Sequence, residues 1–132
     1  MIEKCPDIRW HFIGDCQSKN APKLGGRTRN LACVETLTSA KLADKLQSHL
    51  AKRSETVDAL VQVNTSGEEN KRGVAPGPET VSLARYVVDK CPNLTFKGLM
   101  TIGDLGNSIP RDKSSAEPDS NPDFLSLIEC RK

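Results

Sequence analysis

Apolar runs alternate along this 132-residue chain with segments that have the periodicity of amphipathic helices. The apolar runs are rich in Val, Leu and Ile and end at turns containing Gly, Asn or Thr-Ser-Gly, which is typical of buried strands. Four strands are predicted, over residues 9–14, 31–36, 57–64 and 95–102. Amphipathic segments between them predict helices.

The clearest of these helices begins at Ser39, whose short hydroxyl side chain is a good N-cap. Leu42, Leu46 and Leu50 then recur every four residues, so they share one face of a helix that ends near Arg53. An apolar stripe of this kind predicts that the helix packs against the sheet.

Other helices are predicted from weaker signals. One begins at Pro78 and ends near residue 91, and a final one begins near Pro122. A short helix is expected before Gly25 in the polar stretch that follows the first strand. Residues 104–123 hold three prolines and little that could be buried, so a flexible loop is predicted there.

The order of strands and helices predicts an α/β domain. Strands that are joined through helices form right-handed βαβ units with a parallel sheet. Four such units make about half of a (β/α)8 (TIM) barrel, so we expect residues 1–132 to form a single, incomplete barrel domain. Both edges of such a sheet are exposed, and we expect self-association through them.

Length and composition limit the class of protein. The chain has 132 residues, about half of the roughly 250 in a complete barrel. Charged residues make up 27% and aromatic residues 4%, which predicts a protein of modest stability. No apolar run approaches the roughly 18 residues of a transmembrane helix, and the first residues lack the layout of a signal peptide. We expect no membrane partner and a cytoplasmic location, with mitochondrial association left open.

Charge is unevenly distributed along the chain. Residues 1–53 carry ten Lys and Arg against five Asp and Glu, whereas residues 54–132 carry nine against twelve. The basic residues between positions 19 and 29 have no interleaved aromatic residues and form no known nucleic-acid-binding motif. They are interpreted as a solvated loop, and no nucleic-acid partner is predicted.

The five cysteines are odd in number and form no C-x-x-C pair. Neither a disulfide framework nor a metal site is therefore predicted, and reduced thiols are expected. The sequence also contains no Ser/His/Asp set or phosphate-binding loop that would indicate a catalytic centre.

Four phrases that join an apolar run to a turn carry a family resemblance. They are WHFIG (10–14), VQVNTSGEENKRG (61–73), CPNL (91–94) and GLMTIG (98–103). In order and wording they resemble the pyridoxal phosphate homeostasis proteins, relatives of the N-terminal barrel of alanine racemases. The resemblance implies that the chain holds strands three to six of a (β/α)8 barrel. It also implies pyridoxal 5'-phosphate as the cofactor and intracellular homeostasis by a non-catalytic carrier.

The same resemblance indicates which parts of the family's cofactor site to expect. Neither the segment that bears the Schiff-base lysine nor the phosphate-binding segment has a counterpart in these 132 residues. The alternative is therefore a truncated isoform or gene-model fragment without cofactor binding of its own.

Four residues are the candidates for cofactor contact. Asn64 follows a strand and offers hydrogen bonds, although Asn at such a position also turns the chain. Met100 and Ile102 lie near the place where racemase barrels carry a His against the cofactor ring, with core packing as the alternative. His11 is the fourth candidate, with a satisfied structural role as its alternative. Lys71 is interpreted as an anion-binding or ion-paired lysine, not as the family's Schiff-base lysine.

An amino-acid racemase is the competing functional class. That reaction needs an acid or base on each face of the substrate carbon. The one tyrosine, Tyr86, lies within a predicted helix, and the family's cofactor lysine has no counterpart. No catalytic residue and no enzyme activity are therefore predicted.

Overall fold

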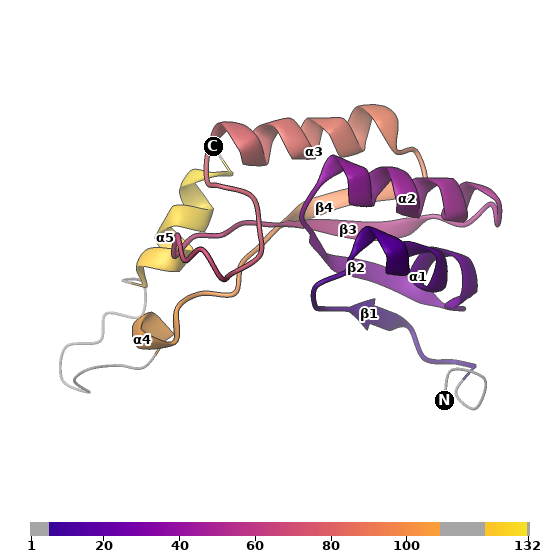
Figure 1. Cartoon of the computed structure of the whole chain (residues 1–132), viewed down its shortest axis with the longest axis horizontal. Coiled ribbons are helices and arrows are strands. Elements are labelled where there is room, and N and C mark those ends of the chain that lie inside the picture. Colours follow the sequence, from indigo (N-terminus) through magenta and orange to yellow (C-terminus); the bar gives the residue numbers. More distant parts are fainter. Residues whose placement is uncertain (1–5, 109–120, 132) are drawn as a thin grey trace.

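Four parallel strands form the sheet in the computed structural model, which describes residues 6–108 and 121–131. The strands are β1 (Trp10–Phe12), β2 (Leu31–Leu37), β3 (Val57–Gln62) and β4 (Leu94–Met100). They lie side by side in this order, and each pairs with the next in parallel (Figure 1). The prediction of an α/β domain with a parallel sheet is confirmed.

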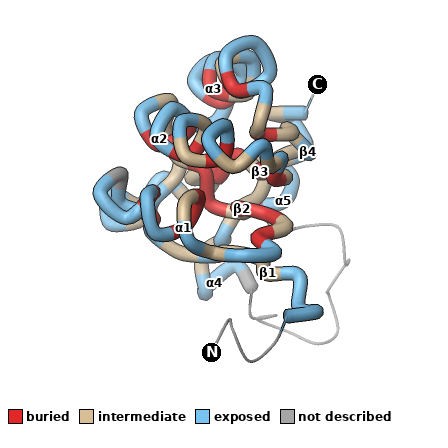
Figure 2. The backbone as a smooth tube through the Cα atoms, turned by 90° about the vertical axis from the view of Figure 1, so that its right-hand side faces the viewer, coloured by how far each residue is buried: buried red, intermediate tan, exposed pale blue. Residues whose placement is uncertain are grey.

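Helices connect the strands and extend the chain after the last one. The helices α1 (Ala21–Arg27), α2 (Ala40–Ala51) and α3 (Pro78–Lys90) follow β1, β2 and β3, and α4 (Leu105–Ser108) and α5 (Pro122–Glu129) follow β4. Helices α1, α2 and α3 cover one face of the sheet (Figures 1 and 2). Among the described residues, no helix has both the length and the apolar character needed to cross a membrane.

Helix α2 forms as its sequence pattern predicts. The Ser39 hydroxyl accepts a hydrogen bond from the Leu42 backbone N–H at 3.2 Å, which satisfies one of the free donors in the first turn. Leu42, Leu46 and Leu50 are at most 1% exposed, because the stripe that they form faces the sheet. This helix supplies the centre of the hydrophobic core.

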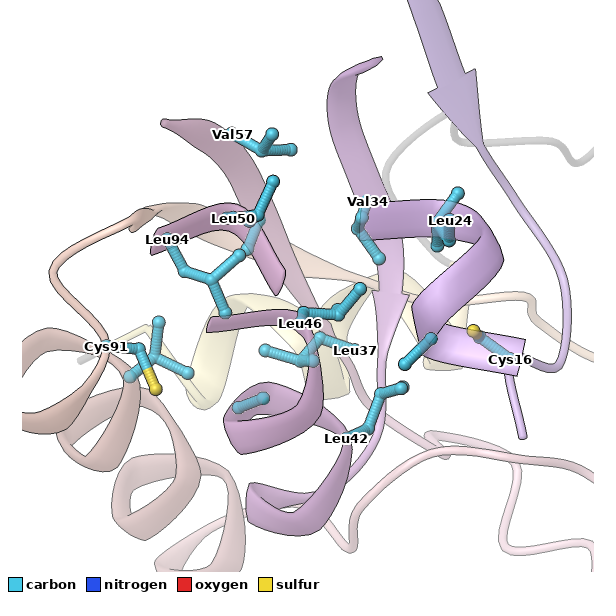
Figure 3. Packing of buried hydrophobic residues seen from close by; sticks show 14 of the residues in the cluster. Cys16, Leu24, Val34, Leu37, Leu42, Leu46, Leu50, Val57, Cys91 and Leu94 are labelled. Carbon is cyan, nitrogen blue, oxygen red and sulfur yellow. The ribbon is translucent and has the colours of Figure 1, made fainter. Parts of the chain in front are cut away.

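The core lies between the helices and the covered face of the sheet. Figure 3 shows Leu46 and Leu50 of α2 packed near Val34, Leu37 and Val57 of the strands. All five side chains are at most 1% exposed. Removing this apolar surface from water is the main favourable contribution to folding.

Helix α1 differs from the prediction, which ended it before Gly25. The helix continues to Arg27, and Gly25 is buried where α1 meets α2. A Cβ atom at Gly25 would lie 3.3 Å from the Cβ of His49 and 3.5 Å from the carbonyl oxygen of Leu46. The glycine therefore permits close helix packing at this position, where the sequence pattern suggested a helix end.

The loop predicted for residues 104–123 is wrong at its start, whereas the helix predicted near Pro122 is confirmed as α5. Leu105–Ser108 forms α4, and Asp123 lies in the first turn of α5 with only 2% exposure. The side chain of Asn121 caps α5 by accepting a hydrogen bond from the Asp123 backbone N–H at 2.9 Å. Residues 109–120 lie outside the described residues.

The second face of the sheet, away from α1, α2 and α3, is polar. His11 lies between Trp10 and Phe12, which pack on the core, and therefore points to the opposite face. By the same alternation Glu35 and Asp58 face this side, where Glu35 pairs with His11 and Asp58 pairs with Lys97. We call this the polar face of the sheet.

Truncation of Leu46 tests the core. We expect Leu46→Ala to lower the free energy of unfolding by about 2–5 kcal/mol, because it leaves a cavity between α2 and the sheet. Urea denaturation followed by circular dichroism measures the change. Leu105→Ala is the matched control: Leu105 is 71% exposed, so a change within about 0.5 kcal/mol is expected. Equal effects of the two substitutions would contradict this description of the core.

Candidate functional site

The carboxyl ends of the strands meet at one edge of the sheet and enclose a small cavity. This is the edge at which parallel α/β proteins build their binding sites. The cavity has a volume of about 140 Å³ and is lined by Gly14, Asp15, Thr36, Gln62, Lys71, Arg72 and Ile102. These residues come from the ends of all four strands or the segments after them, so residues far apart in the sequence converge here.

Hydrogen bonds between neighbouring segments fix the walls of this cavity. The Thr36 hydroxyl donates to the carbonyl oxygen of Gly14 at 2.6 Å, which ties the end of β2 to the turn after β1. The Gln62 amide donates to the carbonyl oxygen of Arg72 at 2.9 Å, and the Arg72 guanidinium lies 3.2 Å from the Asp15 carboxylate. The segment after β3 is thereby held across the strand ends.

Gly73 lets this segment fold back against β3. It has a φ of +129°, and a Cβ atom there would lie 2.7 Å from the backbone nitrogen of Asn64. No other residue fits so close to the neighbouring backbone. Val74 then exchanges backbone hydrogen bonds with Gln62 and Asn64 at 2.9 Å each. The backbone that positions Lys71 and Arg72 depends on this glycine.

Lys71 is the lysine that lines the cavity, and its ammonium group has three polar partners. It forms an ion pair with Glu68, donates to the carbonyl oxygen of Gly103 at 3.1 Å and lies 3.4 Å from the Ser66 hydroxyl. The hydrogen bond from Lys71, followed by the one from Ser66, lowers the pKa of the Glu68 carboxyl. Lys71 therefore links the ends of β3 and β4, and a Schiff base would require its nitrogen to leave these partners.

Asp123 binds the same two strand ends from α5. Its carboxylate accepts hydrogen bonds from the Thr65 hydroxyl at 3.0 Å, the Asp104 backbone N–H at 2.9 Å and the Asn107 amide at 3.0 Å. The hydrogen bond from Asn107 is the main cause that lowers the pKa of Asp123, and it outweighs the opposing effect of burial. A buried, ionised carboxylate is stable here because its oxygens are satisfied.

Thr101 completes the connection between β3 and β4. Its hydroxyl donates to the carbonyl oxygen of Val63 at 2.9 Å and lies 2.8 Å from the Thr65 hydroxyl. The space at this point is also filled, because a Cβ atom at Gly103 would lie 2.8 Å from an oxygen of Asp123. These contacts hold α5 beside the loop that follows β3, as Figure 1 shows.

Comparison with known proteins relates the chain to a family. No protein family model matches the chain. Curated relatives do: the pyridoxal phosphate homeostasis proteins of Homo sapiens and Caenorhabditis elegans are each 42% identical to it over its full length. The whole chain is thus similar to the pyridoxal phosphate homeostasis proteins. It spans about half the length of these relatives, 46% and 52% respectively.

Solved structures of similar fold support the architecture of the chain. A protein of unknown function from Bifidobacterium adolescentis is 29% identical, with a TM-score of 0.69 over 92% of this chain and 43% of that one. PipY of Synechococcus elongatus, solved with pyridoxal phosphate bound, is 19% identical, with a TM-score of 0.63 over 98% of this chain and 56% of PipY. An alanine racemase of Clostridium difficile is 13% identical, with a TM-score of 0.58 over 91% and 29% of the two chains. At these low identities PipY and the racemase show the fold alone, and this confirms the partial barrel.

The residues that the family resemblance singled out fall into separate places. Ile102 lines the cavity and is 53% exposed. Met100 ends β4, where its carbonyl oxygen accepts from the Val63 backbone N–H at 2.8 Å. The Asn64 side chain is used within its own turn: it accepts from the Gly67 N–H at 3.1 Å and donates to the Glu68 carbonyl oxygen at 2.9 Å. Only Ile102 among these three lines the cavity.

His11 lies away from the cavity at the carboxyl ends of the strands. It is the middle residue of β1 and is not among the cavity residues. Its Nδ1 lies 2.7 Å from a carboxylate oxygen of Glu35 on β2. This contact gives the Nδ1 atom of His11 a hydrogen-bond partner on the polar face of the sheet.

Several residues of this edge were not predicted from the sequence. Thr36 and Gln62 are buried polar residues within apolar strands. A polar residue in an apolar run was the sequence signal that could have indicated them. Asp123 lies where the predicted loop and the helix predicted from Pro122 overlap, and no contact of its carboxylate was predicted. Its hydrogen bond to Thr65 joins residues 58 positions apart, which no local pattern reveals.

Replacing Asp123 with Asn tests the carboxylate at this edge. The folded-state pKa of Asp123 lies below its ordinary value of 3.8, so its stabilisation is present above that value and is lost as the pH falls through the folded pKa. We expect Asp123→Asn to lower the free energy of unfolding at pH 7 by about 1–3 kcal/mol, because charge-assisted hydrogen bonds are lost. The variant should also lose less stability than the unmodified protein below pH 4.

Urea denaturation across a pH series measures both effects. Asp89→Asn on the exposed side of α3 is the matched control and should change little. Unchanged stability of Asp123→Asn at pH 7 would show that this carboxylate does not hold the strand ends together.

Proposed function

We propose that this chain serves pyridoxal phosphate homeostasis as a non-catalytic protein and that it supplies one wall of the cofactor site. The observation that carries this proposal is the cavity at the carboxyl ends of the four parallel strands, with two cations, Lys71 and Arg72, in its wall. Cationic side chains suit the phosphate group of this cofactor. The names of the curated relatives support the cofactor assignment.

The four candidate residues receive unequal support as cofactor contacts. We assign Ile102 to the pyridine ring, because its exposed apolar side chain lies on the cavity. Met100 lies at the end of the same strand and supports the backbone there. Asn64 acts through the turn that it stabilises. His11 has the least support, because its ring is engaged by Glu35.

A non-covalent contact fits this chain better than a Schiff base. Lys71 is the lysine that lines the cavity, and its nitrogen is occupied by Glu68 and the carbonyl oxygen of Gly103. The cavity of about 140 Å³ is also smaller than the roughly 300 Å³ at which ligand pockets usually begin. This small volume is the observation that supports the alternative, a truncated chain that binds no pyridoxal phosphate by itself.

We propose a cytoplasmic location, which the free thiols of Cys16, Cys33, Cys91 and Cys130 support, because reducing compartments keep thiols in this state.

We also propose self-association at the edge of β4. A groove of about 670 Å³ beside β4 and the exposed side chains of Val81 and Ile128 support it.

Borohydride trapping tests the non-covalent assignment. The purified chain is mixed with pyridoxal phosphate and reduced, and labelled lysines are mapped by mass spectrometry against a urea-denatured control. We expect no lysine to be labelled selectively in the folded sample, because Lys71 is held by its three partners. Glu68→Gln is the informative variant: it removes the carboxylate partner, so labelling of Lys71 should rise.

Stoichiometric labelling of Lys71 in the unmodified, folded chain would contradict the proposal. It would mean that this chain carries the cofactor covalently. Labelling of Lys71 that is the same in the Glu68→Gln variant as in the unmodified chain would show that the ion pair does not restrain this lysine.

A further inference from the structure

Three side chains with metal-binding donor atoms converge on the polar face of the sheet, outside the cavity described above. They are His11 of β1 and Cys33 and Glu35 of β2, and one donor atom from each lies within 4.8 Å of the other two. From this juxtaposition we propose that His11, Cys33 and Glu35 form a binding site for a divalent transition-metal ion, with Zn²⁺ as the preferred ion.

The strand register brings these residues together. His11 and Cys33 are direct partners in the parallel pairing of β1 and β2, which lie side by side in Figure 1. Glu35 is two residues after Cys33, so both side chains emerge on the same face of β2. Strands hold side chains more rigidly than loops do, which favours a preformed site.

The distances are close to what a metal ion requires. Tetrahedral Zn²⁺ with nitrogen and sulfur ligands separates its donor atoms by roughly 3.5 Å. The Nδ1 atom of His11 and the carboxylate of Glu35 are now 2.7 Å apart, and the whole set spans up to 4.8 Å. Binding of one ion by all three donors therefore requires these distances to change by only about 1 Å.

The chemistry of the donors selects the class of ion. A thiolate and an imidazole favour Zn²⁺ or a similar transition metal over Mg²⁺ or Ca²⁺, which prefer oxygen ligands. Three protein ligands leave one coordination position for water, as in zinc sites that remain open. Cys33 is 6% exposed, whereas the side chain of His11 is 53% exposed, so an ion can enter from the solvent side.

The electrostatic surroundings favour a cation. Two carboxylates, those of Glu35 and Asp58, lie on the polar face together with Cys33. Asp58 is the β3 partner of Cys33 and lies 3.8 Å from the Nζ of Lys97, the nearby positive charge on β4. A divalent ion would offset the repulsion between the thiolate and these carboxylates.

Local sequence spacing did not indicate this site. Zinc motifs are usually recognised by pairs of Cys or His a few residues apart. Here His11 and Glu35 are 24 positions apart and meet through the pairing of two strands. The inference is independent of the proposed cofactor function, and it assigns His11 to metal binding in place of cofactor contact.

Titration of the purified 132-residue chain with Co²⁺, in the absence of pyridoxal phosphate, tests the proposal. A thiolate bound to Co²⁺ gives a charge-transfer band in the near ultraviolet, and tetrahedral Co²⁺ gives intense visible bands. We expect one Co²⁺ per chain, both sets of bands, and loss of these bands when Zn²⁺ is added.

Variants identify the ligands. Cys33→Ser should abolish the charge-transfer band, and His11→Gln and Glu35→Gln should each weaken Co²⁺ binding at least about tenfold. Cys16→Ser, with a buried thiol elsewhere, and Cys130→Ser are matched controls and should retain the band. Both His11 and Glu35 lie outside the apolar core, so their variants are expected to fold.

Three results would overturn the proposal. They are a titration of the unmodified chain without the charge-transfer band, a band that persists in Cys33→Ser, and unchanged affinity in both His11→Gln and Glu35→Gln.

Discussion

The buried carboxylate of Asp123 forms the contacts on which the carboxyl edge of the sheet depends. It joins α5 to the ends of β3 and β4 through Thr65 and the backbone of Asp104. Lys71 crosses the same two strand ends and donates to the carbonyl oxygen of Gly103. A carboxylate without water must be fully hydrogen-bonded, so this demand fixes the relative positions of the strand ends. The positions of the strand ends in turn determine the shape of the cavity that they line.

The two faces of the sheet have different physical roles. The face covered by α1, α2 and α3 holds the leucine-rich core, which Figure 2 shows as the most buried part of the chain. On the polar face, pairs such as His11 with Glu35 and Asp58 with Lys97 place charge across neighbouring strands. Charge on this face opposes non-specific stacking of two sheets, because each pair would have to lose water. The polar face also supplies metal-binding donor atoms, which an apolar face would lack.

Periodicity was enough to predict the sheet and the helices that cover it, because Leu42, Leu46 and Leu50 mark one face of α2 directly. It failed at Gly25, where a residue that usually ends helices instead allows two helices to touch. The strand ends that carry the cavity could also be located, since Ile102 and Lys71 follow apolar runs. The contacts of Asp123 and the approach of Cys33 to His11 could not be predicted, because they join residues far apart in sequence. Asn64 was predicted as a ligand contact or a turn residue, and its side chain serves the turn.

The central claim is that this chain meets its cofactor at the carboxyl edge of the sheet. The most direct measurement is a series of ¹H–¹⁵N correlation spectra of the labelled chain during titration with pyridoxal phosphate. We predict that shifts concentrate on the backbone amides of Gly14, Thr36, Lys71 and Ile102, which line the cavity. Spectra without change, or shifts confined to the groove between α3 and α5, would contradict the claim.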